Sequence, residues 1–172
     1  MVQINMRSRE ITLEVVYYRP ALSGKTSNLQ QLHEVMDPST RSHMLILDTK
    51  KDRTLYFDFL PVEFDAVGGF SIKMKLFTVP GQVMHKSTRK VVQFNKRDMP
   101  DVKPLCQIKE QWGDTPTFPA VATRGEGILE TFRELMRVLY RGLEARHDFS
   151  SKFALSEDEF LKGVMKNFRQ SA

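Results

Sequence analysis

The chain has 172 residues, of which 41% are hydrophobic and 27% charged, a balance that predicts one globular domain and excludes a disordered or fibrous protein. Its net charge of +5 comes from lysines and arginines scattered among acidic residues, without interleaved aromatic residues, which argues against nucleic-acid binding. The one cysteine, Cys106, excludes an intramolecular disulfide and a multi-cysteine metal site, and it agrees with a reducing compartment.

The sequence also argues against membrane attachment. No apolar run approaches the roughly 18–20 residues that cross a bilayer, and the first residues lack a signal-peptide pattern. The chain ends in Ser171-Ala172, without a cysteine to prenylate, and Met1-Val2 lacks the glycine that myristoylation requires. We therefore expect a cytoplasmic protein without a direct membrane anchor.

In chain order, the first predicted elements are a strand, a loop and a helix. Ile11 to Tyr18 is a β-branched and aromatic run that ends at Arg19-Pro20. From Lys25 to Met36, apolar residues recur at helical spacing.

Two alternating runs follow, Thr54 to Leu60 and Phe70 to Val79, with Gly68-Gly69 between them as the turn. Because Pro61 comes just after the first run and suits a strand at a sheet edge, the two runs predict an antiparallel edge pair. The second run is expected to place Ile72, Met74 and Leu76 inward.

The second half of the chain predicts short elements and then a long helix. We expect a short polar helix at Met84 to Lys90, brief strands at Val91 to Phe94 and Thr117 to Ala122, and an amphipathic helix from Ile128 to Leu143. A capping box of Ser156 and Glu159 then predicts a helix in the extension 147–172. This extension either folds back on the domain or binds a partner.

A phosphate-binding element is predicted at Ser23-Gly24-Lys25-Thr26, between the first strand and helix. A turn followed by a helix N-terminus offers backbone N–H groups to phosphate, Lys25 reaches the terminal phosphates and Thr26 ligates magnesium. The full motif has glycine where this chain has Arg19.

A second element predicts guanine recognition. Asn95-Lys96-Arg97-Asp98 follows a strand, and the Asp98 carboxylate can accept from the N1–H and exocyclic amine of guanine, which disfavours an adenine-specific protein. After a later strand, the backbone N–H of Ala122 can bond the guanine carbonyl oxygen.

These motifs in this order resemble the MglA type of bacterial Ras-like small GTPases, the gliding-motility and cell-polarity family. The resemblance runs from Ile4 to Gly142, and it includes Thr78, where most Ras-like proteins have aspartate. The segments that support it are Tyr17-Tyr18, Asp52-Arg53-Thr54-Leu55, Phe57-Asp58-Phe59-Leu60-Pro61, Thr78-Val79-Pro80-Gly81-Gln82 and Asn95-Lys96-Arg97-Asp98. It implies an α/β, Ras-like P-loop GTPase fold over residues 1–146, with a mostly parallel sheet and one antiparallel edge pair.

The resemblance also implies roles for individual residues in binding GTP and GDP with Mg²⁺ and in hydrolysing GTP to GDP. Thr54 joins Thr26 around the magnesium ion, and the amide of Gly81 contacts the terminal phosphate. Gln82 positions the attacking water, and Arg53 serves as an arginine finger, a group that adds roughly 10³ to 10⁵ in rate.

Partners are implied in the same way. The resemblance implies switch segments near 44–54 and 80–90, a roadblock-fold MglB-type dimer as GTPase-activating protein, and downstream polarity or motility effectors. The protein is expected to be monomeric alone and open to recruitment at a cell pole. A rival interpretation is a catalytically weakened pseudo-GTPase that acts as a protein-binding scaffold.

Two departures from the family pattern have consequences. Arg19 and Ala21 replace glycines of the phosphate loop, so we expect strain at Arg19 if its φ is positive, a methyl group near Gln82, and weak hydrolysis without a helper protein. Near 91–93 one strand–helix crossover is missing, because such a unit takes about 30 residues. Either a segment has been left out, which we favour, or a true deletion exists whose strand a partner replaces.

Overall fold

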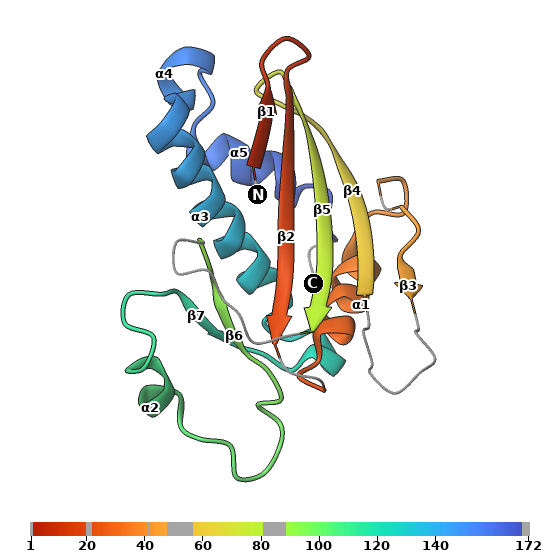
Figure 1. The fold of residues 1–172 in the computed structure, drawn as a ribbon, viewed down its shortest axis with the longest axis vertical. Helices are drawn as coiled ribbons and strands as arrows, with labels where there is room; N and C mark the ends of the chain where they lie inside the picture. The colour runs from red at the N-terminus through yellow and green to blue at the C-terminus, as the bar shows by residue number, and fades with distance from the viewer. Residues whose placement is uncertain (1, 20–21, 41, 48–56, 81–88, 170–172) are drawn as a thin grey trace.

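The large sheet of the protein has helices packed on one face. The computed structural model describes residues 2–19, 22–40, 42–47, 57–80 and 89–169, and Figure 1 shows a five-stranded sheet with a small two-stranded sheet on the side of β2. The strands of the large sheet lie in the order β1-β2-β5-β4-β3. Their bounds are Val2–Asn5 for β1, Glu10–Arg19 for β2, Leu45–Leu47 for β3, Phe57–Val67 for β4 and Phe70–Pro80 for β5.

The prediction of a mostly parallel sheet is wrong for these described residues. Strand β2 runs parallel to β5, but β1 with β2, β3 with β4, and β4 with β5 are antiparallel. The physical reason is that parallel strands need long crossover connections, whereas β1 and β4 reach their neighbours through short turns. The mixed α/β architecture is compatible with a small GTPase fold.

The β4–β5 pair is antiparallel as predicted, but it does not form the sheet edge. Gly68 and Gly69 make the turn with φ values of 57° and 78°, in the left-handed region that favours glycine. Strand β4 continues through Pro61, which lies opposite Lys75 of β5, and β3 lies beyond β4. Pro61 is tolerated because β3 pairs with β4 only at residues 57–59, so its missing N–H faces no strand in the described chain.

One apolar core lies between this sheet and the helices. The predicted inward-facing residues of β5 are confirmed, since Ile72, Met74 and Leu76 are buried whereas Lys75 is exposed. The helices that cover this face are α1 (Lys25–Val35), α3 (Ile128–His147) and α5 (Glu157–Met165). Fully buried Phe132 of α3 and Phe160 of α5 show how much of the core they fill.

The small sheet consists of β6 (Val92–Phe94) and β7 (Thr117–Pro119), which run parallel. The predicted strand to Ala122 is too long, because a 3₁₀ turn, η1, forms at Ala122–Arg124. A short helix, α2 (Leu105–Lys109), lies between the two strands. The helix expected at 84–90 falls mostly outside the described residues, and no described strand or helix lies between β5 and β6.

The extension after α3 folds back onto the domain. Helices α4 (Phe149–Phe153) and α5 follow α3, and the capping box of Ser156 and Glu159 is present as predicted. Phe149, Phe160 and Phe168 join the core formed by residues 11–143. At its end the chain meets the end of α1, where the Arg169 N–H donates to the Val35 carbonyl at 2.7 Å.

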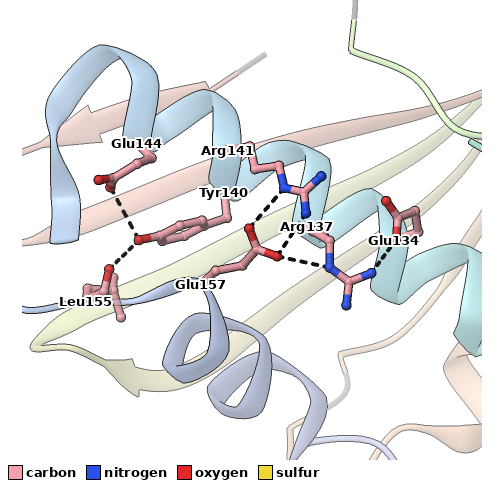
Figure 2. A network of polar contacts seen from close by, with 7 residues as sticks. All are labelled: Glu134, Arg137, Tyr140, Arg141, Glu144, Leu155 and Glu157. Atoms are coloured by element: carbon pink, nitrogen blue, oxygen red, sulfur yellow. Dashed lines mark hydrogen bonds and ion pairs between the residues drawn. The ribbon is translucent and has the colours of Figure 1, made fainter. Parts of the chain in front are cut away.

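A polar network fixes this extension to α3, as Figure 2 shows. Glu157 at the start of α5 lies 3.0 Å from both Arg137 Nε and Arg141 Nε. The hydroxyl of buried Tyr140 donates to the Leu155 carbonyl, and it lies 3.3 Å from a Glu144 carboxylate oxygen. Burial, followed by the nearby negative charge of Glu144, raises the pKa of Tyr140 to about 12.

Tyr140→Phe tests this attachment by its dependence on pH. The folded-state pKa of Tyr140 is above its value of 10.0 in the unfolded chain, so its contribution is complete below pH 10 and is lost as the pH rises toward 12. At pH 7 the variant should unfold with about 1 kcal/mol less free energy, because one hydrogen bond is gone. Denaturant titrations between pH 7 and pH 12 should then show a flatter alkaline decline for the variant. Identical slopes would contradict this role.

Candidate functional site

The turn between β2 and α1 has the geometry of an anion-binding loop. Gly24 precedes α1 with φ 88° and ψ 25°, and a Cβ there would come within 2.2 Å of the Asn95 side-chain nitrogen, so only glycine fits. Lys25 and Thr26 form the first turn of α1, which contains no acidic residue. Backbone N–H groups at such a helix start attract phosphate, and the positive end of the helix dipole adds to the attraction.

The strain considered for Arg19 is not located there. Arg19 is the last residue of β2, extended and paired with Pro80. Among the described loop residues, Leu22 has a positive φ of 61°, in addition to Gly24. Leu22 is also 88% exposed, so the loop presents an apolar side chain to solvent. Ala21 lies outside the described residues.

Asn28 supports the loop from inside α1, and sequence reasoning missed it. Its side chain is 3% exposed, and its Nδ2 donates to the Gly24 carbonyl at 2.8 Å, the same oxygen that accepts its backbone N–H at 3.0 Å. A polar residue adjacent to Leu29 on a buried helix face was the available signal. Two bonds from one residue hold the Gly24 peptide in its left-handed conformation.

The asparagine of the guanine element joins three segments of the site. Asn95 Nδ2 donates to the Ser23 carbonyl at 3.0 Å, and Asn95 Oδ1 accepts the Ala122 N–H at 2.8 Å. The structure therefore brings the phosphate loop, the end of β6 and the turn after β7 together through one side chain. The Ala122 N–H is engaged by Asn95, so it could bond a guanine carbonyl only by sharing or leaving this acceptor.

Asp98 lies at the rim of the same site. Its side chain is 28% exposed and lies 3.9 Å from Arg124 Nη2, a pair that sequence reasoning did not predict. Arg124 is 61% exposed, and exposed ion pairs stabilise a fold by about 1 kcal/mol or less. Lys96 has φ 63°, which turns the chain between Asn95 and Asp98.

The remaining predicted site residues are not placed by the structure. Arg53, Thr54, Gly81 and Gln82 lie outside the described residues. Within the described ranges, no three His, Cys, Asp or Glu side chains gather where they could hold a metal ion. The hydroxyl of Thr26 is an oxygen donor of the kind that Mg²⁺ prefers.

Two tyrosines precede the loop. Burial raises the pKa of Tyr17 above its ordinary range, so its hydroxyl stays protonated at neutral pH. The hydroxyl oxygen of Tyr18 is buried without a hydrogen-bond partner, as is Ser23 Oγ in the loop.

Among the described helices, none has an apolar stretch long enough to span a bilayer.

Asn95→Ala tests whether this side chain holds the site together. The variant should lose about 1–3 kcal/mol of unfolding free energy, because the Ser23 carbonyl and the Ala122 N–H lose their partner. Thermal or urea unfolding measures the loss. Gln107→Ala, at an exposed position of α2, is the matched control and should unfold like the wild type. Equal stability of all three proteins would rule out the bridging role.

Comparison with known proteins adds one relative. A scan against protein-family models finds no match for this chain. A search of characterised proteins finds the mutual gliding-motility protein MglA of Myxococcus xanthus (strain DK1622), which is 29% identical over 189 residues that cover 82% of this chain and 97% of the relative.

This alignment is longer than the chain itself. Because 82% of 172 residues is about 141 residues, about 48 of the 189 aligned positions have no residue in this chain. The relative is therefore similar along nearly its whole length, apart from segments that this chain lacks. This similarity supports an MglA-type family member, and Asn95 brings together the Gly-Lys-Thr and Asn-Lys-Arg-Asp elements on which the resemblance rests.

Proposed function

We propose that the protein is a small GTPase that binds GTP and GDP with magnesium, hydrolyses GTP to GDP, and acts as a switch in gliding motility or cell polarity. The observation that supports this most directly is the Asn95 side chain, which joins the phosphate loop at Ser23 to the Ala122 turn. Through it, a phosphate-binding helix N-terminus and the Asp98 carboxylate belong to one site.

In this proposal different residues bind the phosphates, the base and the magnesium ion. The N–H groups after Gly24 and the ammonium of Lys25 bind the phosphates, and the Asp98 carboxylate accepts from guanine N1–H and the exocyclic amine. Magnesium, held by Thr26 and Thr54 and by phosphate oxygens, neutralises charge on the phosphates. Lys96 lies between Asn95 and Asp98, against the base.

Hydrolysis and its control are also part of the proposal. Arg53 would stabilise the transferring phosphoryl group, Gln82 would orient the attacking water and Gly81 would contact the terminal phosphate through its amide. We further propose a cytoplasmic protein that is monomeric alone, is activated by a roadblock-fold MglB-type dimer, and recruits polarity or motility effectors at a cell pole.

The guanine assignment is tested with Asp98→Ala. Titration calorimetry with magnesium should show binding of GDP and GTP but not ATP by the wild type. The variant should bind guanine nucleotides about 10- to 100-fold more weakly, because it loses charge-assisted hydrogen bonds. Asp114→Ala removes an equally charged but exposed residue away from the site, and it should bind like the wild type. Absence of nucleotide binding by the folded wild-type protein would instead favour the scaffold interpretation.

The hydrolysis step makes a separate prediction. The purified protein alone should turn over GTP far below the roughly 5–20 s⁻¹ of an activated Ras-like enzyme, because Ala21 and Arg19 replace loop glycines. Ala21→Gly should raise the single-turnover rate, whereas Arg53→Ala should lower the rate that an activating partner produces. A rate near 10 s⁻¹ from the protein alone would contradict the proposed dependence on a partner.

A further inference from the structure

Asn28 lies on the buried face of α1, at a position where an apolar residue is expected. Like its helix neighbours Leu29 and Leu32 it is buried, with 3% of its surface exposed. A polar side chain in such a place lowers stability unless its hydrogen-bonding atoms have partners. Within the part of the chain that the structure describes, Asn28 Oδ1 has none. An apolar side chain here would avoid this cost.

The hydrogen bond that the Asn28 side chain does make is not needed to satisfy its acceptor. Asn28 Nδ2 donates to the Gly24 carbonyl at 2.8 Å, but that oxygen also accepts the helical bond from the Asn28 backbone N–H at 3.0 Å. At the start of a helix it is the N–H groups that lack helical partners, whereas the carbonyls lack them only at the helix end. The side-chain bond therefore has an effect other than satisfying an orphan carbonyl.

Asn167 shows the contrast, because it makes the same kind of bond just after α5. It is also 3% exposed, and its Nδ2 donates to the carbonyl of Gly163, four residues earlier, at 3.0 Å. The backbone N–H of Asn167 bonds the Val164 carbonyl instead. The Asn167 side chain thus replaces a helical donor that Gly163 has lost, whereas Asn28 adds a second donor to a carbonyl that already has one.

The second donor constrains the orientation of one peptide group, the one that joins Gly24 to Lys25. A trans peptide is planar, with its C=O and N–H pointing in opposite directions, so a carbonyl held along α1 directs the Lys25 N–H away from the helix. An anion approaches a helix N-terminus from that side. Gly24 has no Cβ and a φ of 88°, so this peptide could turn over at little steric cost. A reversed peptide would point its carbonyl at the phosphates and repel them.

The preceding peptide is held in the same way by a second asparagine. Asn95 Nδ2 donates to the Ser23 carbonyl at 3.0 Å, and the N–H at the other end of that peptide belongs to Gly24. Two successive carbonyls are thus bound by side-chain amides. Adjacent N–H groups of a left-handed residue and a right-handed helical residue form an anion-binding concavity, and Gly24 and Lys25 have these conformations.

We propose that Asn28 is a positioning residue for the nucleotide phosphates. Its side-chain N–H keeps the Gly24 carbonyl directed along α1, and the Lys25 N–H at the other end of the same peptide then donates to a phosphate oxygen of GDP or GTP. The inference rests on the proposed nucleotide site. It adds that this orientation lowers the stability of the nucleotide-free protein, because a buried amide oxygen is left without a donor in the described chain.

Asn28→Leu separates positioning from a structural role, because the two roles predict different changes in stability. Without nucleotide, the variant should unfold at the same temperature as the wild type or higher, since an unpaired buried oxygen is replaced by an apolar branch. Titration calorimetry with GDP and magnesium should show about two- to tenfold weaker binding, which is the loss of one neutral hydrogen bond. Asn28→Ala removes the same donor without adding volume and should lose affinity to the same extent.

Asn167→Ala is the matched control, since it removes an equally buried amide with an equivalent bond, beyond the carboxyl end of α1. It should unfold at a lower temperature than the wild type and bind GDP equally well. The amide proton of Lys25 gives a second readout, because a bond to a charged phosphate moves it downfield in the NMR spectrum when GDP saturates the site. This shift should be smaller in Asn28→Leu and unchanged in Asn167→Ala.

The outcomes separate this inference from the proposed function. Weaker GDP binding by both Asn28 variants but not by Asn167→Ala supports the positioning role. A wild-type protein that binds no GDP would overturn both the function and the inference. If the wild type binds GDP and both Asn28 variants keep its affinity and its Lys25 shift, the positioning role alone is overturned. Lower stability of Asn28→Leu with unchanged affinity would then identify Asn28 as a structural residue.

Discussion

The candidate nucleotide site depends on two hydrogen bonds made by one amide side chain, that of Asn95. Asn95 donates to the Ser23 carbonyl and accepts from the Ala122 N–H, and these bonds link the two sheets at their carboxyl ends. Among the strands that the structure describes, β6 and β7 pair with each other and not with the large sheet. Gly24 also packs against the Asn95 side chain, so closely that a Cβ on residue 24 would clash with it. The position of the Asn95–Asp98 segment relative to the Ser23–Thr26 loop therefore depends on a few contacts of the Asn95 side chain.

Local sequence patterns predicted the elements that depend on nearby residues. The helix after Lys25, the alternating strand with Ile72, Met74 and Leu76, and the capping box at Ser156 are all present. Each of these follows from periodicity or from a bond between residues three or four apart. The short strand β1 was missed because its four residues alternate over too short a length to stand out, and its formation depends on pairing with β2.

Long-range features were the ones that the sequence could not supply. Nothing near Pro61 shows that β4 continues through it, since that depends on where β3 stops. The bonds of Asn28 and Asn95 to the phosphate loop join positions whose proximity only the fold determines. The structure places Asn95 against the phosphate loop and Lys25 at the start of α1, but the binding roles of these residues and of Asp98 stay predictions. The roles of Arg53 and Gln82 come from the resemblance alone.

The last residues of the chain have a consequence for how the protein is made. Met36 pairs with Phe168 in an isolated bridge, and the Asp37 N–H donates to the Asn167 carbonyl at 2.8 Å. Phe160 and Phe168 also fill the core beneath the sheet. Contacts between positions so far apart in sequence form late, since their loop-closure entropy must be overcome first. During synthesis the first helix and strands leave the ribosome with part of their apolar face uncovered, and they can complete the native core only after residues 160–168 have also emerged.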